Sequence, residues 1–100
     1  MKRFHYMNAY IDEDFTDGTI RFISYNSPIL DILDDTLTFY RHWHYSSSTR
    51  RQLTRFLSEK LNKQVSIYEL RDCAKQFVKT GKASLHGYNV IFSDYQPMHY

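Results

Sequence analysis

Cysteine, glycine and proline are all scarce in this chain of 100 residues, which has one, three and two of them respectively. The single cysteine, Cys73, excludes an internal disulfide and is typical of a protein from a reducing compartment. Three glycines are too few for the glycine-rich loops that bind phosphate and dinucleotide groups. We therefore expect an intracellular protein without a nucleotide-binding loop.

The chain also lacks a long apolar run. No stretch reaches the ~18 consecutive apolar residues that a membrane-spanning helix needs. Lys2 and Arg3 at the N-terminus are not followed by the apolar segment of a secretory signal. These absences predict a cytoplasmic protein with no membrane partner.

Aromatic residues are abundant, with nine tyrosines, seven phenylalanines and one tryptophan. A chain of this length and composition buries enough surface for one hydrophobic core, so we expect a single ordered domain over residues 1–100. Tyrosine, tryptophan and arginine are also enriched at recognition surfaces, because they bury large areas or make planar hydrogen bonds. The composition therefore suits a binding protein, although many tyrosines of a small domain simply fill its core.

Charge is divided along the chain, although the net charge is only +2. Residues 1–40 carry three basic and seven acidic side chains, whereas residues 41–82 carry ten basic and three acidic ones. This asymmetry suggests an anionic partner for the middle of the chain. A solvated outer face on two amphipathic helices explains the same pattern without a partner, so both interpretations stay open.

Turn residues and alternating apolar residues predict a hairpin at the N-terminus. Asp17-Gly18 supplies the positive φ of a turn between strands at 4–11 and 19–25. At the other end of the chain, residues 82–95 alternate enough to form either one kinked strand or a hairpin that turns at Gly87. The sequence leaves these two alternatives open.

A second hairpin is predicted after the first, with strands at 29–33 and 37–45 around an Asp-Asp-Thr turn. Pro28 is expected at a bend or an edge, because proline cannot donate a hydrogen bond to a neighbouring strand. Alternation along 37–45 turns the apolar residues toward the core and puts His42 and His44 together on the more polar face.

Two capped helices are predicted after this hairpin. The first begins at Thr49, which forms a capping box with Gln52, and the second begins at Ser66 with Glu69 and ends at Gly81. The apolar stripe of the first helix consists of Leu53, Phe56, Leu57 and Leu61. The stripe of the second consists of Ile67, Leu70, Ala74, Phe77 and Val78.

Together these elements predict an α+β fold, in which an antiparallel β-sheet of two hairpins plus a C-terminal strand has two α-helices packed on one face. A helix-turn-helix with a possible wing at 82–92 is the alternative. It is disfavoured because the turn has no glycine and core residues occupy much of the second helix.

Motifs for catalysis or metal binding are absent, so we expect a protein that is not an enzyme and needs no cofactor. Cys73 falls beside an apolar stripe, where a thiol behaves as a small inert hydrophobe. His42 and His44 supply two nitrogen ligands, but zinc needs three or four protein ligands, and His5, His86 and Cys73 show no matching spacing. We expect no metal site.

The stretch "SSSTRR" at residues 46–51 predicts an anion-binding site, since hydroxyls and arginines surround the start of a helix. Capping alone explains the serines, whereas Arg50 and Arg51 oppose the helix macrodipole and are better explained by a partner. The candidate residues for binding a partner or an anion are Arg41, His42, His44, Ser47, Ser48, Arg50, Arg51, Arg55 and Lys60.

The segments "SYNSPIL" (Ser24–Leu30) and "YSSSTRRQLTRFL" (Tyr45–Leu57) resemble a pattern found in small proteins from phages and mobile elements of Gram-positive bacteria. Ser27 and Ser48 stand where that family has threonine. The resemblance implies a role in phage–host conflict or replication. In that setting, small non-enzymatic proteins bind and inhibit a host protein or protein–nucleic acid complex, including CRISPR effectors, while a nucleic-acid-binding accessory role is the alternative.

Overall fold

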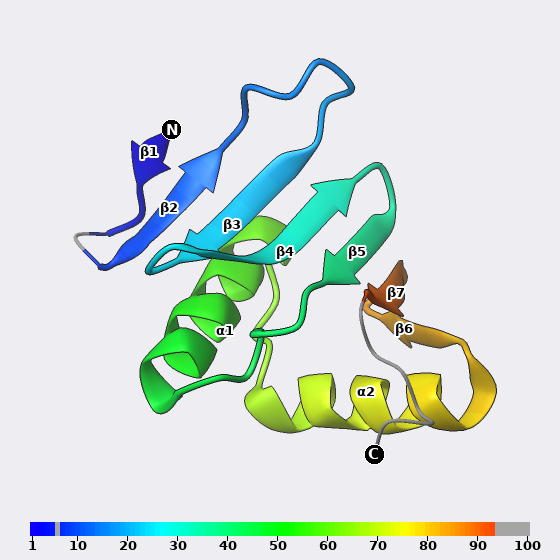
Figure 1. Ribbon diagram of the computed structural model, residues 1–100. Coiled ribbons are helices and arrows are strands. Elements are labelled where there is room, and N and C mark those ends of the chain that lie inside the picture. Colours follow the sequence, from blue (N-terminus) through cyan, green and yellow to red (C-terminus); the bar gives the residue numbers. More distant parts are fainter. Residues whose placement is uncertain (6, 94–100) are drawn as a thin grey trace.

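The computed structural model describes residues 1–5 and 7–93 of the chain. Within this part it has two helices and a seven-stranded sheet, which confirms the predicted α+β class (Figure 1). No helix among these residues is long and apolar enough to cross a membrane. The elements are β1 (Lys2–Arg3), β2 (Ala9–Asp12), β3 (Ile20–Ser24), β4 (Ser27–Leu33), β5 (Thr36–Phe39), α1 (Ser47–Leu61), α2 (Ile67–Thr80), β6 (Ala83–Leu85) and β7 (Tyr88–Phe92).

The strands are ordered β1-β2-β3-β4-β5-β7-β6 across the sheet. Neighbouring strands are antiparallel except β5 and β7, which run parallel with Leu37 opposite Val90. Parallel neighbours need a long crossover connection, and both helices together with β6 supply it here. The sheet is therefore mostly antiparallel, with one parallel pair where the chain returns from the helices.

The C-terminal segment forms a hairpin, which decides between the two predicted alternatives. Strands β6 and β7 are joined by His86 and Gly87, and both residues have positive φ. Two positive φ values are typical of a two-residue hairpin turn whose twist matches the strands. Residues 94 and 95 of the predicted segment lie outside the described residues.

The N-terminal hairpin forms between β2 and β3, but the predicted strand at 4–11 is wrong in its first half. The N–H of Phe4 donates to the carbonyl oxygen of Ala9 at 2.8 Å, so the chain turns back before β2 begins. This turn places the ring of Phe4 edge-on against Phe22 and Phe56 in the core. Residue 6 of the predicted strand lies outside the described residues.

Strand β5 ends at Phe39, so the prediction of a strand through residue 45 is wrong. The N–H groups of Trp43 and Tyr45 donate to the carbonyl oxygens of Tyr40 and His42, which makes two successive turns. Trp43 is only 2% exposed and packs near Phe39 and Phe92, so the chain bends to keep this ring in the core. His42 and His44 consequently do not share a strand face.

Strand β4 contains Pro28 near its start, beside a register shift between Phe22 and Ile23 on β3. Proline is tolerated at such irregularities because one fewer strand-to-strand hydrogen bond is required there. Farther along the same pair of strands, Arg21 donates two hydrogen bonds to the carboxylate of Asp31, at 2.8 and 2.9 Å. This bidentate ion pair fixes the register of β3 and β4.

Helix α1 begins three residues earlier than predicted, with Ser46 and not Thr49 as its N-cap. The side chain of Ser46 accepts a hydrogen bond from the N–H of Thr49 at 3.1 Å. Thr49 and Gln52 are 2% and 6% exposed, so the predicted capping box is wrong because both residues turn inward to Ser24. The helix ends at Leu61 and is capped by Asn62, which has a φ of 53°.

Helix α2 has both predicted ends. Ser66 and Glu69 form the reciprocal capping box, and Gly81 has a φ of 77° at the C-terminal cap. The buried side differs from the predicted stripe, because Cys73 is buried whereas Val78 is 38% exposed. Val78 therefore lies at the edge of the core and faces solvent.

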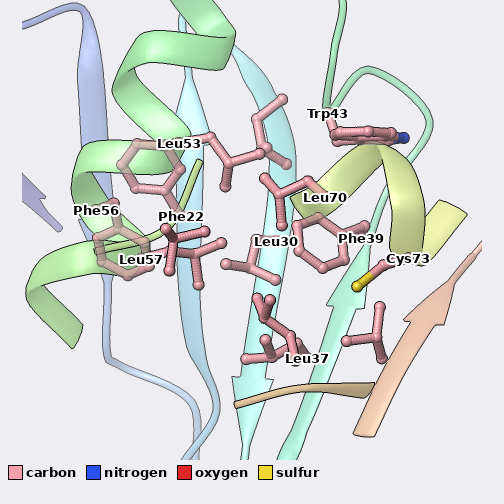
Figure 2. Packing of buried hydrophobic residues seen from close by; sticks show 14 of the residues in the cluster. Phe22, Leu30, Leu37, Phe39, Trp43, Leu53, Phe56, Leu57, Leu70 and Cys73 are labelled. Atoms are coloured by element: carbon pink, nitrogen blue, oxygen red, sulfur yellow. The ribbon is translucent and has the colours of Figure 1, made fainter. Parts of the chain in front are cut away.

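The core lies between the helices and one face of the sheet (Figure 2). On one side, Phe56 of α1 stacks on Phe22 of β3 with ring centroids 4.4 Å apart. On the other side, Leu70 and Cys73 of α2 lie over Phe39. Helix α1 thus packs against β3, and α2 packs against the β6–β7 hairpin.

Candidate functional site

The division of charge along the sequence becomes a division in space. The acidic residues of the β2–β3 connection and of the β4–β5 turn lie at the same end of the sheet (Figure 1). Eight of the ten basic residues at 41–82 lie on α1, α2 and the connection between them, and the other two are Arg41 and Lys82. Cations therefore predominate on the helices, and acidic residues predominate at that end of the sheet.

The arginines of α1 differ in their surroundings. Arg51 and Arg55 are exposed, and Nε of Arg55 lies 3.4 Å from a carboxylate oxygen of Glu59. Arg50 is partly buried, and its guanidinium donates a 3.1 Å hydrogen bond to the carbonyl oxygen of His44. Arg50 thus holds the turn that precedes the helix, whereas Arg51 and Arg55 extend into solvent.

The predicted polar residues around the start of α1 are not all brought together. Ser47 is exposed and Ser48 is partly exposed in the first turn, and Arg41 is exposed in the preceding loop. Lys60 lies near the far end of α1 and lines a hollow beside β1 with His5 and Glu59. Lys60 therefore does not belong to a site at the helix start.

His42 and His44 face two different hollows. His42 lines a hollow of about 440 Å³ with Tyr25, Ser27 and Tyr45, and its ring meets that of Tyr45 edge-on. His44 instead stacks on Trp43, with ring centroids 4.4 Å apart, and lines a groove on α2. The two histidines are not arranged to share a metal ion, and residues 1–5 and 7–93 contain no group of three metal-ligating side chains.

The groove on α2 has a volume of about 470 Å³. Its residues are Trp43, His44, Arg71, Ala74, Lys75, Val78 and Lys79. The three cations follow one another at intervals of four residues, so they form one row along the helix. That spacing was present in the sequence, but nothing in the sequence indicated that the Trp43 loop would close the side of the groove.

His44 lies within electrostatic reach of two arginines, Arg50 and Arg71. Burial lowers the pKa of His44 below its ordinary value, and the charges of Arg50 and Arg71 lower this pKa further. The ring therefore resists protonation, first because its charged form would be incompletely hydrated and also because that charge would lie near two arginines. An anionic group near this ring would be favoured for the same reason.

Two of the helix carboxylates already have cationic or hydrogen-bonding partners. Glu59 contacts Nε2 of His5 at 2.8 Å as well as Arg55. Glu69 accepts the N–H of Ser66 at 3.0 Å and lies 3.0 Å from Nε2 of His86. Both carboxylates are therefore engaged, whereas Asp72, the third carboxylate of the helices, is exposed on α2 beside Arg71.

The two segments that carry the phage-protein resemblance lie side by side. Ser24 of the first segment contacts Thr49 and Gln52 of the second, and Tyr25, Ser27, Tyr45 and Ser46 line one hollow. No protein-family model, curated protein or solved structure matches the chain. The resemblance therefore stays a prediction.

Proposed function

We propose that this protein is a non-enzymatic, phage-type accessory protein that binds and inhibits a host protein or nucleoprotein complex in the host cytoplasm. The docking surface consists of five of the exposed cations on the two helices, Arg51, Arg55, Arg71, Lys75 and Lys79. An anti-defence role, such as inhibition of a CRISPR effector, is the context that the resemblance implies.

The separation of charge is the observation that carries this proposal. Cations outnumber carboxylates on the outward sides of α1 and α2: Glu59 is engaged by His5 and Arg55, Glu69 by Ser66 and His86, and Asp72 is exposed beside Arg71. A surface of one charge sign raises the rate of association with an oppositely charged partner and fixes its orientation. Stability alone gives no reason for this arrangement, because like charges on neighbouring helix turns repel each other.

The cysteine supports a binding role over a catalytic one. Cys73 is buried, and its thiol donates to the carbonyl oxygen of Ser84 at 3.3 Å. Burial raises the pKa of this thiol, and the charges of Asp72 and Glu69 raise it further. A protonated, covered thiol is a poor nucleophile, so Cys73 acts as a core residue.

A nucleic-acid-binding function is the second candidate. Helix α1, a short connection, α2 and the β6–β7 hairpin follow one another in the order of a winged helix-turn-helix, and Arg71, Lys75 and Lys79 are exposed on α2. If phosphates are the partner, the logarithm of the binding constant should fall with the logarithm of salt concentration by about 0.9 per neutralised phosphate on duplex DNA. A flat salt response of nucleic-acid binding would remove this candidate.

Affinity purification from host lysate tests the main proposal. Wild-type protein should recover one stoichiometric partner, and Arg51→Glu with Arg55→Glu should lose it. Arg50 is left unchanged because it bonds to the His44 carbonyl. The matched control, Lys2→Glu with Lys63→Glu, makes the same change in net charge elsewhere and should keep the partner. Retention of the partner by the arginine variant, or its loss from the control alone, would contradict the proposed surface.

A further inference from the structure

The groove on α2 combines an apolar base with a cationic rim. Ala74 and Val78 lie one helical turn apart at its base, and Val78 is 38% exposed. Arg71, Lys75 and Lys79 run along the same length of helix, and the described residues that line the groove include no carboxylate. Its volume, about 470 Å³, lies within the ~300–1,000 Å³ typical of ligand sites.

We infer that this groove binds an acidic protein segment that carries apolar side chains. The inference rests on the proposed function and specifies its partner: carboxylates of the segment meet the row of cations, and an apolar side chain covers Val78 and Ala74. Charge complementarity selects an anionic occupant, since Arg50 and Arg71 already disfavour a positive charge at His44. The apolar base then distinguishes among anionic occupants.

The apolar base favours a protein segment over a nucleic acid. Single-stranded nucleic acids stack their bases on exposed aromatic faces. The only described aromatic residues that line the groove are Trp43, which is 2% exposed, and His44, which is exposed but has one face of its small ring stacked on Trp43 at an interplanar angle of 23°. The exposed apolar surface at the base is instead the aliphatic side chain of Val78. An aliphatic surface contacts a leucine or isoleucine side chain well and offers a base no ring to stack on.

The length of the groove sets the size of the segment. From Arg71 to Lys79 the helix rises by ~12 Å, at 1.5 Å per residue. An extended peptide covers ~12 Å in about four residues, with alternate side chains on opposite sides. An alternation of acidic and apolar residues would therefore place its apolar side chains toward α2 and its carboxylates where the rim can reach them.

Selection from a library of short random peptides displayed on phage particles tests the inference. The bait is the wild-type full-length protein, and the library is counter-selected on Lys75→Glu with Lys79→Glu. Enriched peptides are expected to contain both Asp or Glu and a large aliphatic residue. A synthetic peptide from this set should bind the Val78→Ser variant about tenfold more weakly than the wild type. Its affinity for the Ile91→Ser variant should equal its affinity for the wild type. Ile91 is 43% exposed on β7 and does not line the groove.

Two further probes separate failure of this inference from failure of the proposed function. The first is the same peptide with its aliphatic residues replaced by serine, and the second is a single-stranded oligonucleotide. The apolar base is unused if the serine peptide binds as tightly as the original peptide. It is also unused if the Val78→Ser variant binds the original peptide normally while the Lys75→Glu with Lys79→Glu variant does not. In either case, or if the groove binds the oligonucleotide but not the peptide, only the inference about the acidic segment is wrong. If no acidic peptide or oligonucleotide binds the wild type at low salt, the proposed function falls as well.

Discussion

The hydroxyl of Ser24 on β3 donates a 2.6 Å hydrogen bond to Oε1 of Gln52 on α1, and both side chains are buried. The same hydroxyl lies 3.1 Å from Oγ1 of Thr49. Buried polar atoms are nearly always hydrogen-bonded, because an unpaired one loses its hydration without compensation. This cluster therefore fixes the position of α1 over the sheet more specifically than the surrounding apolar contacts.

Replacing Ser24 with alanine should destabilise the protein measurably. The buried Oε1 of Gln52 would lose its donor, which costs about 1–3 kcal/mol of unfolding free energy. Ser84→Ala is the matched control: Ser84 also lies on a strand, but it is exposed and its change should stay within about 0.5 kcal/mol. Urea denaturation measures both. Equal stabilities for the two variants would show that the buried hydroxyl contributes nothing.

The second prediction concerns Ser46, the N-cap of α1. Ser46→Ala should cost about 1 kcal/mol, because the N–H of Thr49 would lose its side-chain acceptor. Ser47→Ala, one residue farther along in the exposed first turn, should change the unfolding free energy little. The same urea titrations measure the difference. If Ser47→Ala were the more damaging of the two, the helix would begin at a different residue.

Helix α2 could be predicted at both ends because its signals are local. A capping box and a C-terminal glycine act within one turn of the helix, so Ser66, Glu69 and Gly81 are recognisable from spacing alone. The turn at His86-Gly87 was recognisable for the same reason, although a continuous strand remained an alternative. Helix ends and turns that are determined by residues close in sequence can therefore be predicted from the sequence.

The start of α1 and the end of β5 could not be predicted because distant residues determine them. Thr49 and Gln52 fit a capping box in the sequence, but Ser24 draws both into the interior. Trp43 fits a continued strand, but its ring packs against both Phe39 and Phe92 in the core, and the chain turns after Phe39. Such long-range contacts appear only once the fold is known.

The candidate site was predictable in the same partial way. The excess of cations on the helices followed from counting charges, and Arg51 and Arg55 are indeed exposed. Arg50 differs from them because it donates a hydrogen bond to the carbonyl oxygen of His44, in a turn that the sequence did not indicate. The groove combines that loop with one side of α2, so neither segment revealed it alone.

The last prediction concerns the pKa of His44 and the pH dependence of stability that follows from it. Burial first, and then the charges of Arg50 and Arg71, lower this pKa in the folded protein. The unfolded chain, in which these effects are lost, takes up the proton at the ordinary histidine pKa of about 6.5. Between that value and the lower folded pKa, the unfolded state binds more protons, so stability falls as the pH drops below about 6.5.

Arg71→Gln should raise the pKa of His44, because it removes one neighbouring charge while keeping a long polar side chain. The loss of stability below about pH 6.5 should then become smaller. Titration of the His44 ring protons by NMR measures the pKa directly. Arg51→Gln, at an exposed position on α1, is the control and should leave this titration close to that of the wild type. If the pKa of His44 were unchanged in the Arg71→Gln variant, the charge of Arg71 would not act at His44. The groove would then lack the positive charge on which recognition of an acidic segment depends.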